Sequence, residues 1–545
     1  MTHQDRIFSR APVKQILTMT PVRLVVLTTL FLCFFANSVF FRHVIEAVPM
    51  NAENRLFVVS VGILFFTLAL LIVQLLSLFI PVRIVCSLMI LSAAIAGYFM
   101  DQFGVVIDTD MLSNALQTDT AEAGDLFTLK LLVYLVFLGL VPVALIYYLP
   151  FTSQGRAVDL RHQLTLLVVT ALIIALNLAI FNSRYASFIR EQRDIRYYMN
   201  PFYPIHSVFK MLPTFFQASS VSELQVLDPD PKITEVDEDK PELIILVVGE
   251  TARADHFSLN GYERNTNPEL SQLSGVISFA NLTSCGTSTA ISVPCMFSFS
   301  DEKAFDADTS EYTQNVLDVL SKAGVSVLWR DNNSSSKGVA NRITYQNFKS
   351  PELNPVCDIE CRDEGMLSGL QEYIDAQSGD ILIVLHQMGS HGPAYYKRYP
   401  SEFSVFEPAC QSNVLSDCSQ AEIINAYDNT ILYTDYFLSR VIALLKANAS
   451  GYETSMIYMS DHGESLGEYG VYLHGMPKMM APDSQVHVPV VVWANESSDI
   501  DLEQTKALSA EPSSHDALAI SLLALFEVDN HLALKNKPLI ILKDE

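Results

Sequence analysis

The sequence predicts two structural parts: a five-helix transmembrane domain, then an α/β domain whose mostly parallel sheet is sandwiched by helices. Half of the 545 residues are hydrophobic, and the apolar excess lies almost entirely in the first 200 positions. That excess forms runs close to the ~20 residues that a membrane helix needs. From residue 241 onward, short apolar runs alternate with amphipathic segments, which is typical of a parallel sheet covered on both faces.

The long apolar runs near the N-terminus predict membrane spans. A cleavable signal peptide fits poorly, because the first run is too long for one and further runs come after it. The expected spans are 22–41, 56–80, 82–100, 127–149 and 163–181.

Charged residues in the short loops predict the orientation of these spans. Lys and Arg precede the first span, which places the N-terminus in the cytoplasm. The loop at 101–126 carries Asp and Glu but no Lys or Arg, as expected outside, whereas the loop at 150–162 carries Arg156 and Arg161. Five spans then place everything after about residue 182 on the outer side.

The cysteines test this topology independently. Cys33 and Cys86 lie inside expected spans and are interpreted as small apolar side chains. The others all fall in the outer domain, and closeness in sequence favours pairing each with its neighbour. A zinc knuckle would need shorter spacings, so an oxidising compartment explains the pattern better. The expected pairs are Cys285/Cys295, Cys357/Cys361 and Cys410/Cys418.

Composition divides the chain into three expected domains: 1–182 in the membrane, 183–240 as a connection, and 241–545 as the outer catalytic domain. Within the connection, 183–218 mixes basic and aromatic residues, which suits a membrane surface as well as a solvated connector. Residues 219–240 form an acidic, proline-containing linker. The net charge of −25 argues against nucleic acid, which requires a basic patch.

In the outer domain, the residues directly after each expected strand are the first candidates for a site, because ligands gather beyond the carboxyl ends of parallel strands. The expected helices cover 312–323, 364–376 and 421–446. The expected strands are Leu243–Val248, Val325–Trp329, Ile381–Leu385, Met456–Met459 and His487–Trp493.

Four of these strands are followed by polar side chains that suit a metal site. Carboxylates and imidazoles are ligands of a borderline cation such as zinc. Adjacent Asp461 and His462 can both contribute if the chain turns at Gly463. The polar residues after the strands are Glu250, Asp331, Asn333, Lys337, His386, His391, Asp461, His462, Glu464 and His474.

A hydroxyl-rich turn between Cys285 and Cys295 reads Cys-Gly-Thr-Ser-Thr-Ala-Ile-Ser-Val-Pro-Cys. The residues after it can open a helix whose first amides point at an anion. A threonine hydroxyl is a poor nucleophile unless a base or metal activates it. Beside a zinc site, such a hydroxyl indicates covalent transfer of a phosphoryl-type group, and Thr287, Ser288 and Thr289 are all candidates.

Five motifs stand out in the outer domain: Ser284-Cys-Gly-Thr-Ser-Thr-Ala, Val293-Pro-Cys-Met-Phe-Ser, Asp331-Asn-Asn-Ser, Ser390-His-Gly-Pro and Ser460-Asp-His-Gly-Glu-Ser-Leu-Gly. These motifs resemble those of bacterial phosphoethanolamine transferases, which include the lipid A-modifying and mobile colistin-resistance enzymes of the alkaline phosphatase superfamily. The resemblance extends over nearly the whole chain.

The resemblance implies roles for individual residues. Thr289 is the implied nucleophile, and one tightly bound zinc is held by Thr289 with Glu250, Asp461 and His462. The implied substrate or second-metal positions are Asn333, Lys337, His386, His391, Glu464 and His474. Asn114, Thr118 and Glu122 match positions near the lipid, and their spacing of four predicts that they share one helix face.

The implied reaction transfers phosphoethanolamine from phosphatidylethanolamine to lipid A, in the bacterial inner membrane, by a monomer with its catalytic domain in the periplasm. This modification confers polymyxin resistance. A core sugar or another glycan is an alternative acceptor. Glycerol-phosphate transfer, as in lipoteichoic acid synthases, and a non-enzymatic membrane sensor are alternative functions. A sulfatase is not expected, because no Cys/Ser-x-Pro-x-Arg motif occurs around 285–300.

Overall fold

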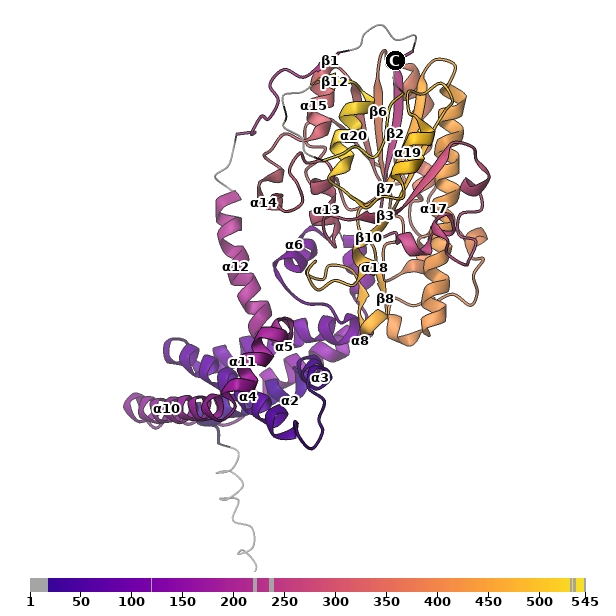
Figure 1. Ribbon diagram of the computed structural model, residues 1–545. Coiled ribbons are helices and arrows are strands. Elements are labelled where there is room, and N and C mark those ends of the chain that lie inside the picture. Colours follow the sequence, from indigo (N-terminus) through magenta and orange to yellow (C-terminus); the bar gives the residue numbers. More distant parts are fainter. Residues whose placement is uncertain are drawn as a thin grey trace, which may run out of the picture. The chain divides into compact units, whose positions relative to one another are not determined.

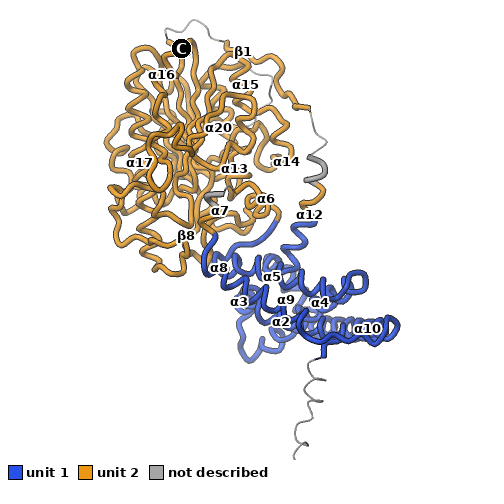
Figure 2. The backbone as a smooth tube through the Cα atoms, turned by 180° about the vertical axis from the view of Figure 1, so that it is seen from behind, with its two compact units in different colours: residues 1–108, 127–210 blue, residues 109–126, 211–545 orange. Residues whose placement is uncertain are grey.

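The computed structural model describes residues 18–118, 120–218, 223–234, 240–529, 532 and 536–543. Its internal contacts divide the chain into two compact units (Figure 2). Unit 1 comprises residues 1–108 and 127–210, and unit 2 comprises residues 109–126 and 211–545. The loop at 109–126, although it connects two membrane helices in sequence, therefore packs with unit 2.

Unit 1 consists of apolar helices. Four are long and apolar enough to cross a membrane, and a bent pair, α2 and α3, raises the number to five among the described residues if it counts as one span. The helices are α2 (Pro21–Phe35), α3 (Ser38–Ala47), α4 (Arg55–Phe79), α5 (Val82–Phe103), the run α8–η1–α9 (Leu129–Tyr148) and α10 (Arg156–Ile180).

The first expected span, 22–41, is not one straight helix, because α2 and α3 meet at a bend of 60°. Asn37 explains the break. Its amide donates to the Leu32 carbonyl at 2.9 Å and to the Asn200 carbonyl at 2.7 Å. The Asn200 backbone amide returns a bond to Asn37 Oδ1 at 3.0 Å. These bonds satisfy polar groups that a helix break leaves open.

The segment expected to connect the domains is helical over most of its first part. It forms α11 (Asn182–Glu191), η2 (Arg193–Tyr198) and α12 (Phe202–Ala218). Tyr185 on α11 lies 3.0 Å from the Ser60 hydroxyl of α4. Its location at the membrane surface stays a prediction, as does the expected boundary at residue 182.

Unit 2 contains an eight-stranded mixed sheet in the order β11-β3-β10-β7-β2-β6-β4-β5. Every neighbouring pair is parallel except those of β10, which runs antiparallel to both β3 and β7. The strands are β2 (Glu242–Gly249), β3 (Val276–Thr283), β4 (Ser326–Asp331), β5 (Thr344–Asn347), β6 (Ile381–His386), β7 (Glu453–Ser460), β10 (His487–Ala494) and β11 (Ser513–Ser514).

All five expected strands are present. The sequence did not predict β3, because it alternates buried with exposed positions and contains Ser278 and Asn281 instead of a continuous apolar run. Two small sheets pair β1 (Lys232–Ile233) with β12 (Val528–Asp529) and β8 (Ser465–Leu466) with β9 (Tyr472–Leu473).

Helices cover both faces of the sheet, as expected (Figure 1). On β2, Ile244 and Leu246 pack into the core with α15 (Val316–Ala323) and α20 (Ala517–Leu525). Leu243 and Ile245 pack into the opposite core with α16 (Leu370–Asp375) and α17 (Gln420–Asn448). Burial on both faces explains why this strand is apolar throughout.

The bounds of the expected helices differ from those that their apolar spacing indicates. The helix expected at 312–323 begins at Val316, because Asn315 forms a capping box with Asp318. The one expected at 421–446 is α17, capped by Ser419 and Glu422. The segment expected at 364–376 divides into η6 (Asp363–Leu367) and α16.

The three expected disulfide pairs are confirmed. Cys285 bonds to Cys295, Cys357 to Cys361 and Cys410 to Cys418. Cys33 and Cys86 are free and buried, as expected for apolar side chains within helices.

Candidate active site

Two adjacent strand ends bring Glu250, Asp461 and His462 together. The parallel register pairs Gly249 of β2 with Ser460 of β7, so the next residues leave the sheet side by side. Each of the three offers a ligand atom, and these atoms lie within 4.8 Å of one another. All three side chains are completely buried. The three expected ligands therefore lie close enough together to bind one metal ion.

Thr289 is the first residue of α13 (Thr289–Met296) and contacts this cluster. Its hydroxyl lies 3.1 Å from Glu250 Oε2 and 3.3 Å from His462 Nε2. The Thr287 hydroxyl instead donates to the Met476 carbonyl at 2.6 Å. The Ser288 hydroxyl makes no hydrogen bond to the described residues. Of the three candidate hydroxyls, the described contacts place that of Thr289 against the carboxylate.

The hydroxyl-rich turn is held from several sides. Besides the Cys285–Cys295 bond, the Gly286 amide donates to Ser292 Oγ at 3.0 Å. A Cβ at Gly286 would lie 2.7 Å from Ile291, so the turn requires glycine there. His515 accepts the Cys285 N–H at its Nδ1, at 3.1 Å, and bonds the Ser460 carbonyl through Nε2 at 2.9 Å. His515 thereby connects the turn to the end of β7.

Burial changes the charge states in this cluster. Burial, with repulsion from Asp461, raises the pKa of Glu250 to about 7. Burial likewise raises the pKa of Asp461 to about 7, and Asp461 Oδ2 accepts no hydrogen bond from the described residues. Burial, with the neighbouring His474, holds the pKa of His462 well below its usual range. His462 is therefore a neutral imidazole.

This arrangement fits a cation. His462 Nδ1 bonds the Gly463 carbonyl at 2.9 Å, so the single ring proton of the neutral imidazole lies on Nδ1. Nε2 therefore carries a lone pair, which faces the carboxylates. Nε2 lies 3.3 Å from Asp461 Oδ2 and 3.5 Å from Glu250 Oε1. A lone pair against two carboxylates is unfavourable unless a carboxyl proton or a metal cation lies between them. Two carboxylates, a neutral imidazole and a hydroxyl form a donor set suited to zinc.

Asn333 and Lys337 lie on the loop after β4 as expected, and Asn333 contacts the cluster. The Asn333 amide donates to Glu250 Oε2 at 2.7 Å and to the Gln387 carbonyl at 2.7 Å. Lys337 Nζ donates to the Gln117 carbonyl at 3.3 Å, so it contacts the loop at 109–126.

The expected histidines divide into two groups. His386 Nδ1 bonds Asp331 Oδ2 at 3.0 Å, completely buried beside Trp329. His474 Nδ1 bonds Glu464 Oε2 at 2.9 Å. The His474 ring lies 4.4 Å from that of His462 and 5.6 Å from that of His391, centre to centre.

A second metal at these histidines stays a prediction. Within the described part of the chain, the one other group of at least three acidic or imidazole ligand atoms within 4.8 Å is Glu242, Glu453 and Asp499. That group lies where β2 and β7 begin, at the opposite end of these strands.

The prediction that Asn114, Thr118 and Glu122 share one helix face is wrong. Helix α6 (Thr109–Gln117) ends before Thr118, and α7 (Thr120–Leu126) begins after it. The Thr118 hydroxyl donates back to the Asn114 carbonyl at 2.9 Å. The side chain of Glu122 lies outside the described residues. The helix α6 itself packs against α13, which begins with Thr289.

Sequence reasoning missed three residues that support the site. His515 is one, and burial lowers its pKa to about 3, which keeps it neutral. Tyr395 donates to Glu464 Oε1 at 2.7 Å. Asp363 accepts the backbone N–H groups of Met388 and Gly389, at 2.8 and 3.1 Å. Tyr395 and Asp363 do not directly follow a strand. His515 directly follows β11, but this strand of two serines forms no apolar run in the sequence, so the expected strand ends could not reveal any of the three.

Comparison with protein families gives two matches. The sulfatase family model matches residues 242–528, and the model for the phosphoethanolamine transferases EptA and EptB matches residues 64–214. The first match covers the sheet and the metal-type cluster, and the second covers most of the apolar helices and the loop at 109–126.

Individual proteins resemble nearly the whole chain. Phosphatidylethanolamine transferase Mcr-1 from Escherichia coli is 43% identical, over 94% of this chain and 96% of that protein. Phosphoethanolamine transferase EptA from Salmonella typhimurium is 38% identical, over 84% of each chain. The structure of the integral membrane protein lipooligosaccharide phosphoethanolamine transferase A from Neisseria meningitidis superposes with a TM-score of 0.88 at 32% identity. It covers 93% of this chain and 96% of that one.

The architecture, the sulfatase-like sheet that supports the Glu250–Asp461–His462 cluster, and the relatives matched along almost their full length lead to one assignment. The chain belongs to the phosphoethanolamine transferase family.

Proposed function

We propose that this protein transfers phosphoethanolamine from phosphatidylethanolamine to lipid A, with Thr289 as the nucleophile. The observation that carries the proposal is the Thr289 hydroxyl, buried at the N-terminus of α13 and 3.1 Å from Glu250 Oε2. A buried nucleophile beside a base is the arrangement that covalent group transfer requires. The names of the related transferases support the choice of group.

Zinc is the proposed cofactor, held by Glu250, Asp461, His462 and Thr289. When bound, zinc would offset negative charge on the cluster and on the phosphoryl group. The protein's own contribution is the fixed donor set: His462 presents its Nε2 lone pair because Gly463 holds the proton at Nδ1. Asn333 orients the Glu250 carboxylate through its amide.

The proposed reaction has two half-reactions. Thr289 Oγ1 forms a bond to phosphorus while the bond from phosphorus to the diacylglycerol oxygen breaks. The threonine proton passes to a basic group, for which Glu250 Oε2 lies within reach at 3.1 Å. Diacylglycerol leaves with a proton on its oxygen. A protonated lipid A phosphate oxygen then attacks phosphorus and passes its proton to the same basic group. The bond from phosphorus to Thr289 breaks, and the basic group returns the proton to Thr289 Oγ1, which restores the hydroxyl.

The charge that develops on the phosphoryl oxygens needs donors. The first amides of α13 have no carbonyl partner within the helix and would face an anion bound at its N-terminus. Lys337 on the loop after β4 is the proposed source of positive charge. Asn333 on the same loop donates its amide hydrogens to Glu250 and the Gln387 carbonyl, so its proposed role is to orient Glu250. We assign His391 and His474 to substrate binding, with Glu464 holding His474 in one orientation.

The proposed location is the bacterial inner membrane, with the N-terminus in the cytoplasm and the catalytic domain, 241–545, in the periplasm. In this topology α2 and α3 together form one span, which gives five. The disulfides support an oxidising compartment for unit 2. We propose a monomer with both lipid substrates in one leaflet, which raises their effective concentration.

Mass spectrometry of lipid A tests the proposal. Cells that express the protein should gain lipid A heavier by one phosphoethanolamine and should resist polymyxin. Thr289→Ala should abolish both effects, while Thr289→Ser, which keeps a hydroxyl, should retain part of the activity. Full modification by Thr289→Ala would disprove the assignment.

The same experiment separates the alternatives. One relative is named Kdo(2)-lipid A phosphoethanolamine 7''-transferase, from Escherichia coli, at 29% identity over 76% of this chain. A mass gain on core sugar instead of lipid A would assign that type of acceptor. A glycerol-phosphate adduct on Thr289 would indicate the lipoteichoic acid synthase type of reaction, and no adduct with no lipid change would indicate a sensor.

A further inference from the structure

A buried ion pair joins the loop at 109–126 to the rest of unit 2. Asp125, 6% exposed, accepts bonds at both carboxylate oxygens. Lys397 Nζ lies 2.5 Å from Oδ1, and Arg398 Nη2 lies 3.0 Å from Oδ2. The Asn413 amide adds a bond to the Asp125 carbonyl at 3.1 Å. Asp125 of this loop is therefore held, through its side chain and its backbone carbonyl, by three residues about 270 to 290 positions later.

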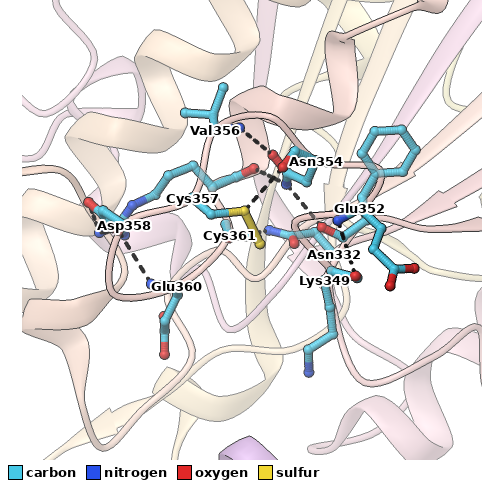
Figure 3. Close-up of a disulfide and its surroundings, with 12 residues drawn as sticks. Asn332, Lys349, Glu352, Asn354, Val356, Cys357, Asp358, Glu360 and Cys361 are labelled. Carbon is cyan, nitrogen blue, oxygen red and sulfur yellow. Dashed lines mark hydrogen bonds and ion pairs between the residues drawn. A yellow bond between two sulfur atoms is a disulfide. The ribbon is translucent and has the colours of Figure 1, made fainter.

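Arg398 extends this contact toward the candidate site. The arginine is 5% exposed, and its Nε donates to the His391 carbonyl at 2.7 Å. It also bonds Glu360, which lies on the short loop closed by Cys357 and Cys361 (Figure 3). One side chain thus connects the loop at 109–126 to the backbone of a proposed substrate residue.

The disulfide loop continues the connection to the residues after β4. The Asn332 amide donates to the Cys361 carbonyl at 3.0 Å (Figure 3) and to Asp363 Oδ1 at 2.8 Å. Asn333, the next residue, bonds Glu250. Arg398 therefore contacts three segments: the loop at 109–126 through Asp125, the segment that contains His391, and the loop closed by Cys357 and Cys361 through Glu360.

The loop has a second attachment at its other side. Lys337 Nζ donates to the Gln117 carbonyl, and α6 packs against α13. The two attachments, Gln117 and Asp125, flank the part of the loop that contains Thr118, and Asn114 precedes it. Of the residues expected near the donor lipid, Thr118 therefore lies between the two attachments.

We propose that Asp125 and Arg398 form a latch that positions the loop at 109–126 for the donor phospholipid. They are positioning residues, since neither contacts the Glu250–Asp461–His462 cluster in the described structure. The proposal rests on the proposed function for the identity of that lipid. An exposed ion pair contributes little free energy. A buried ion pair holds both partners in place, because removing one partner leaves an uncompensated buried charge.

The test compares Asp125→Asn, which removes the charge at almost unchanged volume, with Asp110→Asn in the same loop. Asp110 is exposed and lies outside the latch, so it is the matched control. The full-length protein in phosphatidylethanolamine-containing micelles is assayed for diacylglycerol release. We expect Asp125→Asn to raise the KM for phosphatidylethanolamine by about tenfold with little change in kcat, as for lost ground-state positioning. Asp110→Asn should match the wild type.

A second variant approaches the latch from its other side. Lys397 is half-buried, and Lys397→Met should reproduce the KM effect while the core of unit 2 stays folded. Equal KM values for Asp125→Asn and Asp110→Asn would overturn the proposal. A fall in kcat at unchanged KM would also overturn it, because it would indicate general damage to the site.

The rate of proteolysis measures whether the loop at 109–126 is held by the latch, without any enzyme assay. A glutamyl endopeptidase can cleave the loop after Glu122 once the loop leaves unit 2. We expect faster cleavage there in Asp125→Asn and Lys397→Met than in Asp110→Asn. Unchanged cleavage would overturn the latch. If the wild type released no diacylglycerol, the proposed function would fail, and the cleavage rates would still decide the latch.

Discussion

Asn333 Nδ2 and Thr289 Oγ1 both contact one atom, Glu250 Oε2, at 2.7 and 3.1 Å. The carboxylate oxygen nearest the proposed nucleophile is thus held in place by an amide from a different strand end. The bond from Asn333 fixes the orientation of the Glu250 carboxylate. Because this bond does not involve Thr289, the carboxylate is oriented toward the threonine hydroxyl independently of the threonine itself.

Asn333→Asp should therefore reduce activity more than Asn333→Ala. The alanine variant loses a hydrogen bond to a charged group, worth about 1.5–3 kcal/mol, which corresponds to roughly 10- to 150-fold in rate. The aspartate adds a negative charge against Glu250. Diacylglycerol release measures the effect, with the exposed Asn341→Asp as control. Equal rates for Asn333→Asp and the wild type would contradict the positioning role.

Metal binding should depend on pH near neutrality. In the metal-free protein the pKa values of Glu250 and Asp461 are both raised to about 7, chiefly by burial. Zinc must displace these protons, so its affinity should rise with pH up to about 7 and then level off. Isothermal titration in several buffers measures both the affinity and the protons released. Zinc affinity that is constant from about pH 5.5 to 7.5 would disagree with these pKa values.

The same pKa shifts predict the stability of the metal-free protein. A carboxyl group whose folded pKa is raised favours folding while it is protonated. Its contribution is complete below the unfolded pKa, near 4, and is lost as the pH rises through about 7. The melting temperature of the metal-free protein should fall over this window. Asp461→Asn, which cannot ionise, should flatten the fall.

The sequence predicted the parts of this site that lie directly after buried strands. Glu250 and Asp461 could be placed together because β2 and β7 are continuous apolar runs, and parallel strands end at one edge. The direction of β10 could not be predicted, since a buried strand reads alike in both orientations. The end of helix α6 before Thr118 could not be predicted either, because regular spacing of residues along the sequence does not reveal where a helix ends.

His515 illustrates a different limit. A lone histidine 53 residues after His462 carries no local signal, and its role emerges from two backbone bonds, to Cys285 and Ser460.

His515→Ala would leave a buried N–H and a buried carbonyl unpaired, at about 1–3 kcal/mol each. We expect urea unfolding to show that loss. His515→Gln, which offers both a donor and an acceptor, should recover part of it. Wild-type stability of the alanine variant would show that the bridge is dispensable.

The Cys285–Cys295 bond should affect catalysis more than a comparable disulfide elsewhere. Thr289 lies inside the segment that this bond closes, whereas the Cys410–Cys418 segment contains none of the proposed catalytic or metal-binding residues. The two segments have sequence separations of 10 and 8 residues, so their chain-entropy contributions to stability should be similar, about 2–3 kcal/mol each.

Replacing each cysteine pair by alanine should therefore lower the melting temperature by similar amounts. At saturating phosphatidylethanolamine, the rate per folded molecule should fall for Cys285→Ala/Cys295→Ala and remain near wild type for Cys410→Ala/Cys418→Ala. Saturation removes any effect on KM that arises because Asn413, within the second segment, contacts Asp125. Equal rates in both double variants, measured by diacylglycerol release on the folded fraction, would show that the bond stabilises the fold without orienting the threonine.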